Sequence, residues 1–553
     1  MKLVECVPNF SEGLDSKIIN EICNSVKSCN VNVLDVDSGR DTNRTVFTFV
    51  GTPENVINAA YNVIESSSKL IDMNKHTGEH PRMGATDVCP FVPIKNVTMK
   101  DCVEYSKKLG RMVGDKLKIP VYLYENSATK KYRSNLADIR KGEFEGMADK
   151  LSIDKWRPDY GPDKIHPTAG VVAIGARDFL IAYNVNLNTT DKKIATDIAL
   201  DIREMGRAKR DEKGKIIRDK FGKMIKKKGK LKSVKAVGWY LEEFKQCQVS
   251  MNLINYSINS LHHTFEEIRT QARKRGVRVT GSEIVGLVPL KPIIMAADFY
   301  LESQNRHIGI PEKDKIDIAI KSLGLSELNK FNAHESIVEY SVNKSNSLST
   351  MRINEFCDEV SLESPAPGGG SVSALLGALG GSLVSMVGAL SYNKKGYEKN
   401  NSRYNKISLA AQKLKDDLLN LIDLDSEAFY LIMDAFRLPK KTTKQIEIRD
   451  QEILSATKTA IDVPMETMVK SLDVIKLSNQ MIKIGNLNSL SDVGVASESA
   501  YSAFNSALLN VKINLSSLTD QIYKNKINKK CNALIQKAEK EISLSRDLIE
   551  KKM

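Results

Sequence analysis

The stretch VNVLDVDSGRDTNRTVFTFVG, residues 31–51, decides the fold of the amino-terminal part of the chain. Two runs rich in β-branched and apolar residues, 31–37 and 45–50, flank a polar segment that contains Gly39. This pattern predicts two strands joined by a turn. The flanking sequence adds strands at 3–7 and 87–92 and helical periodicity at 17–26 and 54–70. The order βαββαβ is that of a ferredoxin-like unit.

The same order of elements returns in the following segment. Strand patterns occur at 179–187, 234–241, 246–254 and 284–290, and helical patterns at 192–205 and 261–274. The sequence therefore predicts an α+β amino-terminal part built of two ferredoxin-like (βαββαβ) subdomains.

The character of the chain changes after the polar segment NKSNSLS at 343–349. Long helical patterns dominate from there on, and no convincing strand follows, so we expect an all-α helical bundle. The predicted domains are residues 1–178 and 179–330 for the two α+β subdomains, 331–350 for a linker and 351–553 for the helical domain.

The charge is concentrated in one segment. The chain has 553 residues and a net charge of +14, and residues 207–235 alone hold 14 Lys and Arg against three Asp and Glu. This basic insert contains the repeat RDEKGKII and RDKFGKMI, which predicts successive turns. It reads either as an exposed excursion or as an electrostatic funnel for an anionic substrate. Nucleic acid is an unlikely partner, because the insert offers only Phe221 for base stacking.

Cysteine usage and the amino terminus indicate the compartment. The eight cysteines are scattered without a CxxC motif, which fits a reducing environment. The amino terminus, MKLVECVPNF, lacks the apolar run of an export signal, so we expect a cytoplasmic protein. Residues 371–390 are long enough to span a bilayer, but their glycines and serines favour a buried helix of a bundle, and no membrane partner is expected.

The segment KHTGEHPRMG at 75–84 is the densest cluster of chemically active residues. His76 and His80 have the spacing of two metal ligands on a helix, but Gly78 and Pro81 argue against a helix there. A catalytic acid or base at His80 is the favoured interpretation, with a structural loop histidine as the alternative. No metal is predicted.

Several motifs of the chain resemble known families. VECVPNFSEG (4–13), LDVDSGRDTNRTVFTFVG (34–51) and HTGEHPRMGATDVCPFVP (76–93) resemble the glutamate formiminotransferase family. PAPGGGSVSALLGALG (365–380), LIDLDSEAFYLIMDAFRLPK (421–440) and GNLNSLSDVGVA (485–496) resemble the cyclodeaminase/cyclohydrolase family. In this order, the motifs resemble the family of bifunctional formimidoyltransferase-cyclodeaminases.

The resemblance implies that the first part moves the formimino group from N-formimino-L-glutamate to tetrahydrofolate. The acid/base histidine of the family's GEHPRMG motif corresponds to His80, Asp37 could orient its ring, and Arg82 or Arg44 could hold a glutamyl carboxylate. The folate-binding stretch of the family corresponds to the following ten residues: Gly161, Pro162, Asp163, Lys164, Ile165, His166, Pro167, Thr168, Ala169 and Gly170.

The resemblance implies that the second part converts 5-formiminotetrahydrofolate to 5,10-methenyltetrahydrofolate and ammonia. No histidine follows His334, so a carboxylate, Lys, Tyr or Ser must carry the proton. A carboxylate is the favoured candidate, and the family's catalytic aspartate corresponds to Asp425. Partial burial together with acidic neighbours is expected to raise the pKa of this aspartate. Candidate binding residues of the second site are Gly369, Gly370, Ser371 and Asn486, and Ser371 also reads as a helix N-cap.

Alternatives remain open at the level of the sequence. The chain could be a glutamate formyltransferase or a methenyltetrahydrofolate cyclohydrolase, or a basic scaffold or nucleic-acid-binding protein with inactive sites. The resemblance further implies that the folate could carry a polyglutamate tail and that the chain forms a homo-oligomer with sites at its interfaces.

Overall fold

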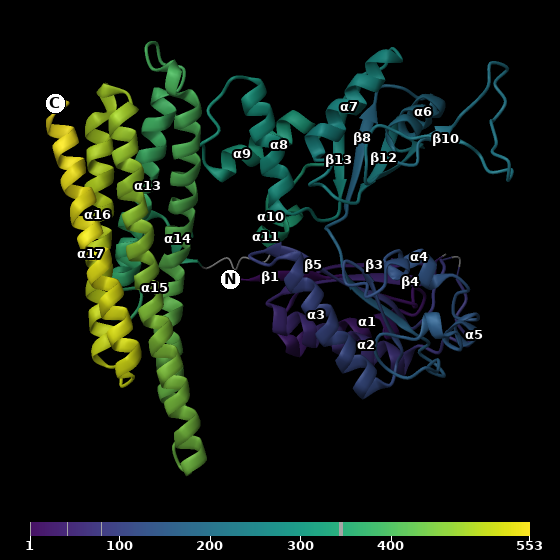
Figure 1. The fold of residues 1–553 in the computed structure, drawn as a ribbon, viewed down its shortest axis with the longest axis horizontal. Coiled ribbons are helices and arrows are strands. Elements are labelled where there is room, and N and C mark those ends of the chain that lie inside the picture. The colour runs from purple at the N-terminus through teal and green to yellow at the C-terminus, as the bar shows by residue number, and fades with distance from the viewer. Residues whose placement is uncertain (1, 41, 79, 342–346) are drawn as a thin grey trace. The chain divides into compact units, whose positions relative to one another are not determined.

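A computed structural model describes residues 2–40, 42–78, 80–341 and 347–553 of the chain. The contacts divide it into two compact units, Met1–Ala296 with Ala319–Asn343 and Ala297–Ile318 with Lys344–Met553. The first unit is mixed α/β with sheets and the second is helical, as the sequence predicts at this level (Figure 1). The centre of the predicted linker, 342–346, lies outside the described residues.

In the described part of the first unit, seven strands form one mixed sheet. They are β1 (Leu3–Cys6), β2 (Asn9–Phe10), β3 (Asn32–Gly39), β4 (Arg44–Gly51), β5 (Thr86–Lys95), β6 (Val121–Glu125) and β7 (Val172–Ala176). The order β3-β4-β1-β5 is antiparallel, β2 pairs with β4 and β5, and β7 pairs in parallel with β5 and β6.

Helices cover one face of this sheet. They are α1 (Ser16–Asn24), α2 (Pro53–Leu70) and α3 (Met99–Met112). Alternate strand residues such as Phe47 and Phe49 are fully buried against apolar helix residues. Local signals begin the helices, because Asp15 caps α1 and Thr98 forms a capping box with Asp101 at α3. The other face carries a second, smaller apolar cluster, in which Tyr122 and Tyr124 of β6 pack with Ile139 and Met147.

The second sheet has the order β11-β12-β8-β13 and is antiparallel throughout. Its elements are β8 (Ile181–Leu187), α6 (Lys192–Ile202), β11 (Val234–Leu241), β12 (Gln246–Leu253), α7 (Leu261–Lys274) and β13 (Val279–Val285). The last strand was predicted at 284–290, and that placement is wrong. Gly286, with φ of +75°, follows β13, and Leu290 already begins helix α8 (Leu290–Ser303).

The basic insert forms two successive turns between β9 (Arg207–Ala208) and β10 (Lys226–Lys227). Each repeat closes on its own glycine, because Arg210 donates to the carbonyl of Gly214 and Arg218 to that of Gly222. Its lysines are exposed. The turns predicted from the repeat are confirmed.

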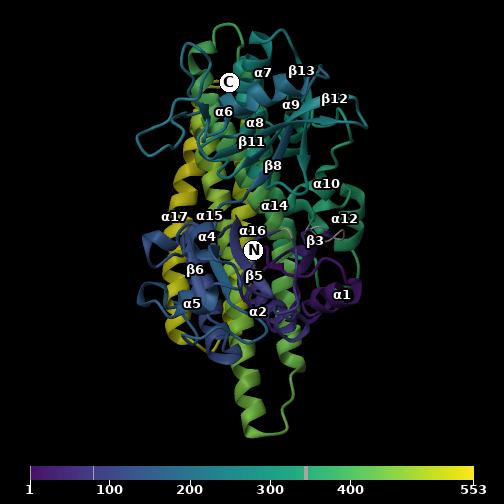
Figure 2. The same cartoon turned by 90° about the vertical axis from the view of Figure 1, so that its right-hand side faces the viewer.

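The second unit is a bundle of long helices. They are α13 (Gly369–Ser391), α14 (Asn401–Arg437), α15 (Thr443–Ile484), α16 (Leu490–Ser516) and α17 (Gln521–Glu550), preceded by the short α12 (Ile353–Val360). α13 packs against α14, α15 and α16, and α17 packs against α15 and α16. In Figure 2, α14 and α15 form a hairpin that extends beyond the other helices of this unit.

Residues 297–318 belong to the helical unit, although the predicted boundaries assign them to the second α+β subdomain. The carbonyl of Gly309 accepts a hydrogen bond of 2.8 Å from Ser385 of α13, and the backbone N–H of Ile308 donates to Asn405 of α14. Polar anchoring to two bundle helices explains the assignment. Among the described residues, α13 is the helix long and apolar enough to cross a membrane, and more than half of its most apolar stretch is buried inside the protein.

Candidate active sites

His80 lies in the loop between α2 and β5. Its Nδ1 atom is 2.7 Å from the carbonyl oxygen of Pro81. Because a carbonyl oxygen only accepts hydrogen bonds, Nδ1 carries the hydrogen in this contact, and Nε2 of the neutral ring keeps its lone pair. The loop therefore fixes the ring so that Nε2 is the atom able to take up a proton.

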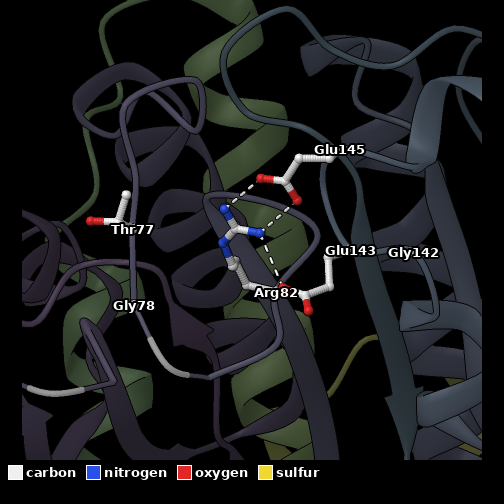
Figure 3. A pocket seen from close by; sticks show the side chains of 6 residues that line it. All are labelled: Thr77, Gly78, Arg82, Gly142, Glu143 and Glu145. Carbon is white, nitrogen blue, oxygen red and sulfur yellow. Dashed lines mark hydrogen bonds and ion pairs between the residues drawn. The ribbon is translucent and has the colours of Figure 1, made fainter.

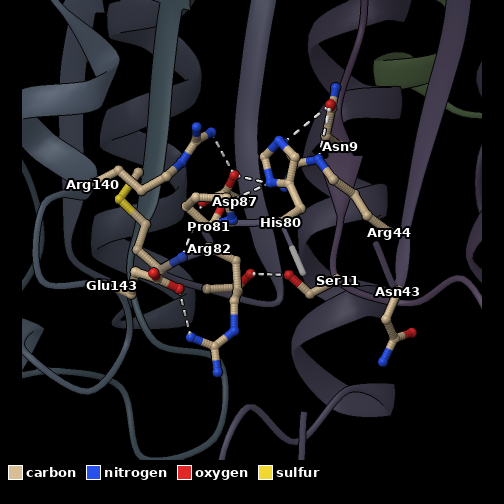
Figure 4. Close-up of polar contacts among 12 residues, drawn as sticks. Asn9, Ser11, Asn43, Arg44, His80, Pro81, Arg82, Asp87, Arg140 and Glu143 are labelled. Carbon is tan, nitrogen blue, oxygen red and sulfur yellow. Dashed lines mark hydrogen bonds and ion pairs between the residues drawn. The ribbon is translucent and has the colours of Figure 1, made fainter. Parts of the chain in front are cut away.

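Arg44, Asp87 and Arg140 form an ion cluster beside His80 (Figure 4). Asp87 is fully buried, and its Oδ2 atom accepts hydrogen bonds of 2.7 Å from Nη1 of Arg44 and from Nη2 of Arg140. Its Oδ1 atom accepts from the backbone N–H of Met83 at 3.0 Å. One carboxylate thus ties three segments together that are distant in the sequence.

The surroundings lower the pKa of His80. Burial is the largest cause, because it disfavours the charged imidazolium, and the positive charge of Arg44 acts in the same direction. Arg140 also lowers the pKa, whereas the Pro81 carbonyl and Asp87 oppose the shift. The ring is therefore neutral at neutral pH and can act first as a base.

His76 is a structural residue of the same loop. It is buried, its Nε2 donates to the carbonyl of Asn43 at 2.8 Å, and its Nδ1 accepts from Nε of Arg82 at 3.3 Å. Both ring nitrogens have protein partners, so the two-histidine metal pair considered from the spacing does not form in this geometry. The side-chain amide of Asn43 also donates to the carbonyl of Thr77 at 2.8 Å, which ties the β3–β4 turn to the loop, and its Oδ1 accepts from the N–H of Gly13.

Arg82 is held by two carboxylates at the rim of a hollow of about 460 Å³ (Figure 3). Its Nη1 lies 3.1 Å from Glu143, and its Nη2 lies 2.7 Å from Glu145 and 3.1 Å from the carbonyl of His76. The guanidinium is therefore occupied by protein carboxylates, and its role in holding a substrate carboxylate stays a prediction. It supports the loop that carries His80.

Asp37 lies on β3 with an exposed side chain. Among the described residues, no hydrogen bond or ion pair joins it to His80. Asp87 is instead the carboxylate whose charge reaches the imidazole. The orienting role of Asp37 has no support in the geometry of the single chain and stays a prediction.

The predicted folate-binding stretch, residues 161–170, lies against the carboxyl end of the His80 loop. The carbonyl of Ala169 accepts from the N–H of Ala85 at 2.9 Å, and the carbonyl of Thr168 accepts from the N–H of Met73 at the same distance. His166 accepts from the N–H of Ala169 through Nδ1, and burial lowers its pKa. The stretch and His80 are therefore held in one neighbourhood.

The remaining members of this stretch are largely accessible. Gly161 begins it in a left-handed conformation with φ of +82°, and a Cβ there would lie 2.5 Å from the carbonyl oxygen of Ile119. Pro162, Ile165 and Thr168 are half-buried, and Gly170 is buried. Exposed members of the stretch are Asp163, Lys164 and Pro167.

A second site lies where the first turn of α13 meets α14. Ser371 is fully buried, and its hydroxyl is 3.0 Å from the carbonyl of Ile422, to which it donates, and 3.2 Å from Oδ2 of Asp425. A Cβ on Gly370 would lie 2.0 Å from Oδ1 of Asp425. Only glycine at position 370 allows the carboxylate to rest on the start of α13 in this way.

The pKa of Asp425 is raised. Burial is the largest cause, and hydrogen bonds from the side chain and backbone of Ser371 oppose it. Of the two expected causes, burial is confirmed, whereas the acidic neighbours do not contribute. Asp423 accepts hydrogen bonds from Ser347, Leu348 and Ser349, and Glu427 is exposed.

Two other expectations for the second site are also corrected. The N-cap of α13 is Gly368, so Ser371 lies inside the first turn rather than capping the helix. The backbone N–H of Asn486 donates to Ser391 at the far end of α13, about 33 Å from Gly369 for a helix of that length. Asn486 is therefore not brought together with Asp425.

Family models match nearly the whole chain. The formiminotransferase domain, N-terminal subdomain, matches residues 3–177, the formiminotransferase domain matches 182–343, and formiminotransferase-cyclodeaminase matches 352–533. A formimidoyltransferase-cyclodeaminase from Dictyostelium discoideum is 40% identical over 553 residues, covering 98% of this chain and 97% of its own. The chain belongs to the formimidoyltransferase-cyclodeaminase family. The resemblance predicted from the motifs is confirmed.

The chain also aligns with two shorter proteins. A glutamate formimidoyltransferase from Streptococcus pyogenes serotype M1 is 47% identical over 305 residues, covering 55% of the chain and 95% of its own. A methenyltetrahydrofolate cyclohydrolase from Methylorubrum extorquens is 37% identical over 186 residues, covering 34% of the chain and 89% of its own.

Sequence reasoning missed several residues of these sites. Asp87 and Arg140 form the ion cluster, Asn9 accepts from Arg44, and the side chain of Asn510 lies 3.5 Å from a Cβ placed on Gly369. The sequence does carry a signal for Asp87, because it is a charged residue at the start of the otherwise apolar run 87–92. Nothing local distinguishes Arg140 or Asn510.

Proposed function

We propose that this chain catalyses two consecutive folate reactions of histidine degradation. The first transfers the formimino group from N-formimino-L-glutamate to N5 of tetrahydrofolate. The second closes the ring of 5-formiminotetrahydrofolate to 5,10-methenyltetrahydrofolate and releases ammonia. The observation that carries the proposal is the pair of proton carriers, His80 and Asp425, whose pKa values both shift toward the neutral form.

In the transfer, N5 of tetrahydrofolate attacks the amidine carbon and forms a tetrahedral intermediate. The neutral His80 accepts a proton through Nε2, and the same ring then donates it to the departing glutamate nitrogen. Its Nδ1 contact with the Pro81 carbonyl keeps the ring orientation through both steps and stabilises the imidazolium between them. The stretch 161–170 binds the folate beside this ring.

In the cyclisation, N10 attacks the formimino carbon, and the exocyclic nitrogen leaves as ammonia. Asp425 with a raised pKa can hold a proton and give it to that nitrogen. Ser371 orients the carboxyl group, and the turn at Gly369 and Gly370 brings backbone N–H groups to the site. The chemistry needs no metal ion.

We further infer the finer features that the family resemblance implies. Both sheets have the strand order of a ferredoxin-like unit, with the fourth strand beside the first and the third beside the second, which supports two such subdomains. The scattered cysteines support a cytoplasmic location. The exposed apolar side chains Tyr430, Leu431 and Phe436 on α14 support a homo-oligomer with sites near its interfaces.

The alternative chemistry is formyl transfer with a cyclohydrolase reaction in the helical unit. It has one point of support, the methenyltetrahydrofolate cyclohydrolase that is 37% identical to the chain over 186 residues. Both alternatives use the same proton carriers. The two alternatives differ in the donor, which carries a formimino or a formyl group, and in whether ammonia is released. These two properties therefore distinguish them.

A coupled assay tests the proposal. The chain is supplied with tetrahydrofolate and either N-formimino-L-glutamate or N-formyl-L-glutamate, and methenyltetrahydrofolate absorbance and ammonia are followed. We expect both products from the formimino donor. His80→Ala should lower transfer by about 10²–10⁴-fold, and Asp425→Asn should leave transfer intact and accumulate 5-formiminotetrahydrofolate. Wild-type chain that works only with the formyl donor and releases no ammonia would overturn the proposal.

The basic insert could hold the polyglutamate tail of the folate, because its exposed lysines offer an anionic chain a positive field. Replacing Lys226, Lys227 and Lys228 by Gln should raise the KM for a polyglutamylated folate at low salt, and the difference from wild type should shrink at high salt. The KM for the monoglutamate is the control. Equal values for wild type and variant at both salt concentrations would refute this role.

A further inference from the structure

Arg140 has a hydrogen-bond donor that the described part of the chain does not satisfy. It ends the short helix α4 (Leu136–Arg140), and its Nη2 atom donates to Asp87 at 2.7 Å. Its Nε is buried without a hydrogen-bond partner in the described part of the chain. A buried donor of a charged group that lacks a partner costs free energy, so a missing acceptor is expected there.

The other two arginines around His80 differ in this respect. Arg44 gives Nη1 to Asp87 and both Nε and Nη2 to Oδ1 of Asn9, at 3.3 and 3.1 Å. Arg82 is occupied by two glutamates and the carbonyl of His76. Of the three, Arg140 is the guanidinium with a donor left for a ligand, so it differs from the arginines considered in the sequence analysis.

Among the described residues, the ion pairs of the cluster join two arginines to one carboxylate, which leaves one positive charge in a largely buried place next to His80. The side chain of Arg140 is 15% exposed, whereas Asp87, which holds its Nη2 atom, is fully buried. A carboxylate bound to Arg140 would balance the cluster and supply the missing acceptor.

We propose that Arg140 binds the α-carboxylate of N-formimino-L-glutamate, with Asp87 as the positioning residue that aims the guanidinium. This inference rests on the proposed transfer reaction. The chemistry of the donor favours the α- over the γ-carboxylate, because the α-carboxylate carbon is two bonds from the nitrogen that His80 must protonate. Arg140 lies beside the His80 ring, where it shares Asp87 with Arg44, and is therefore placed for the α-carboxylate (Figure 4).

The test compares two donors in the full chain, N-formimino-L-glutamate and its α-amide, which lacks the α-carboxylate. The variants are Arg140→Gln and Arg140→Lys, with Arg269→Gln, a half-exposed arginine paired with Glu266, as the matched control. If a donor is turned over too slowly for its KM to be measured, it is added as an inhibitor of the reaction with N-formimino-L-glutamate, and its inhibition constant is compared instead. Cyclisation of added 5-formiminotetrahydrofolate reports whether each variant is folded.

We expect Arg140→Gln to lower kcat/KM for N-formimino-L-glutamate by about 100-fold, mostly through KM, and to change the value for the α-amide by less than about threefold. Arg140→Lys should recover part of the loss, and the KM for tetrahydrofolate should not move. An equal loss for both donors, or a loss confined to kcat, would overturn the assignment. A wild-type chain inactive with the formimino donor would instead refute the proposed function.

Discussion

The two sites reach a similar chemical state by different means. In the α+β unit, His80 stands among fixed charges, and burial together with Arg44 lowers its pKa. In the helical unit, Asp425 has no charged group among the causes of its shift, and burial alone raises its pKa against the hydrogen bonds of Ser371. Burial disfavours the charged form of either residue, so one physical cause prepares a base in one unit and an acid in the other.

The construction of the sites differs as well. In the first, His80 lies on a loop, and a buried salt-bridge cluster around Asp87 joins β4, β5 and α4. In the second, a glycine lets the carboxylate of Asp425 on α14 rest against the first turn of α13. The first site depends on a charge network, whereas the second depends on space.

The largest effect is expected from a substitution that disrupts the second site only by adding an atom where there is no room for it. In Gly370→Ala the new Cβ would lie 2.0 Å from Oδ1 of Asp425, so the carboxylate must move away. Because the clashing atoms end a flexible side chain, the fold should persist while cyclisation falls by about 100-fold or more. Ammonia release from 5-formiminotetrahydrofolate measures this, and formimino transfer should be unchanged.

The matched control is Gly494→Ala on α16, where a Cβ would meet only the end of Ile549 at 3.1 Å. It should keep both activities. Full cyclisation by Gly370→Ala would mean that Asp425 does not need its position against α13, and the comparison of the two sites would lose its geometric basis.

Much of the fold could be predicted because its signals are local. The predicted bounds of β11 and α7 agree with the structure, since alternating apolar residues mark the strand and Ser260 caps the helix. β7 was missed, because VVAIGA carries no alternation. Its place comes from parallel pairing with β5 and β6, which are distant in the sequence.

The sites could be predicted only where a motif marks them. His80 and Asp425 stand in specific motifs, whereas Arg140 is one of 82 lysines and arginines. What distinguishes it is a 2.7 Å contact with Asp87, 53 residues away, and no pattern in the sequence encodes such a contact. The prediction that acidic neighbours raise the pKa of Asp425 failed for a similar reason, because the fold directs Asp423 to the segment 347–349.

Glu5 offers a test of burial in the α+β unit that is independent of catalysis. It is 3% exposed on β1, and burial raises its pKa to about 7, against the charge of Arg177. Since the folded-state pKa lies above the value of 4.5, the stability that this group contributes is present below pH 4.5 and is lost as the pH rises through about 7. The loss amounts to about 3 kcal/mol at most.

Glu5→Gln removes this titration. The thermal midpoint of the variant relative to wild type should therefore rise by several degrees between pH 5 and pH 8. Glu104→Gln, at an exposed site on α3, should show no such change. A constant difference between Glu5→Gln and wild type across this range would show that the buried carboxyl does not titrate there.

The smallest expected effect refines the comparison at Asp425. Hydrogen bonds from Ser371 stabilise the carboxylate and oppose the rise of its pKa, so Ser371→Ala should raise that pKa further. An acid works while protonated, and the high-pH limb of the cyclisation rate should therefore move upward, by less than about one pH unit. His80 sets the low-pH limb of the rate of formimino transfer. The midpoint of this limb should lie below the ordinary imidazole pKa of about 6.5 and should be the same in the variant as in wild type. Ser382→Ala, whose hydroxyl bonds to the carbonyl of Ala378 within α13, is the control. A downward shift in Ser371→Ala would mean that the hydroxyl favours the protonated acid, and burial would then not be the only force that keeps Asp425 neutral.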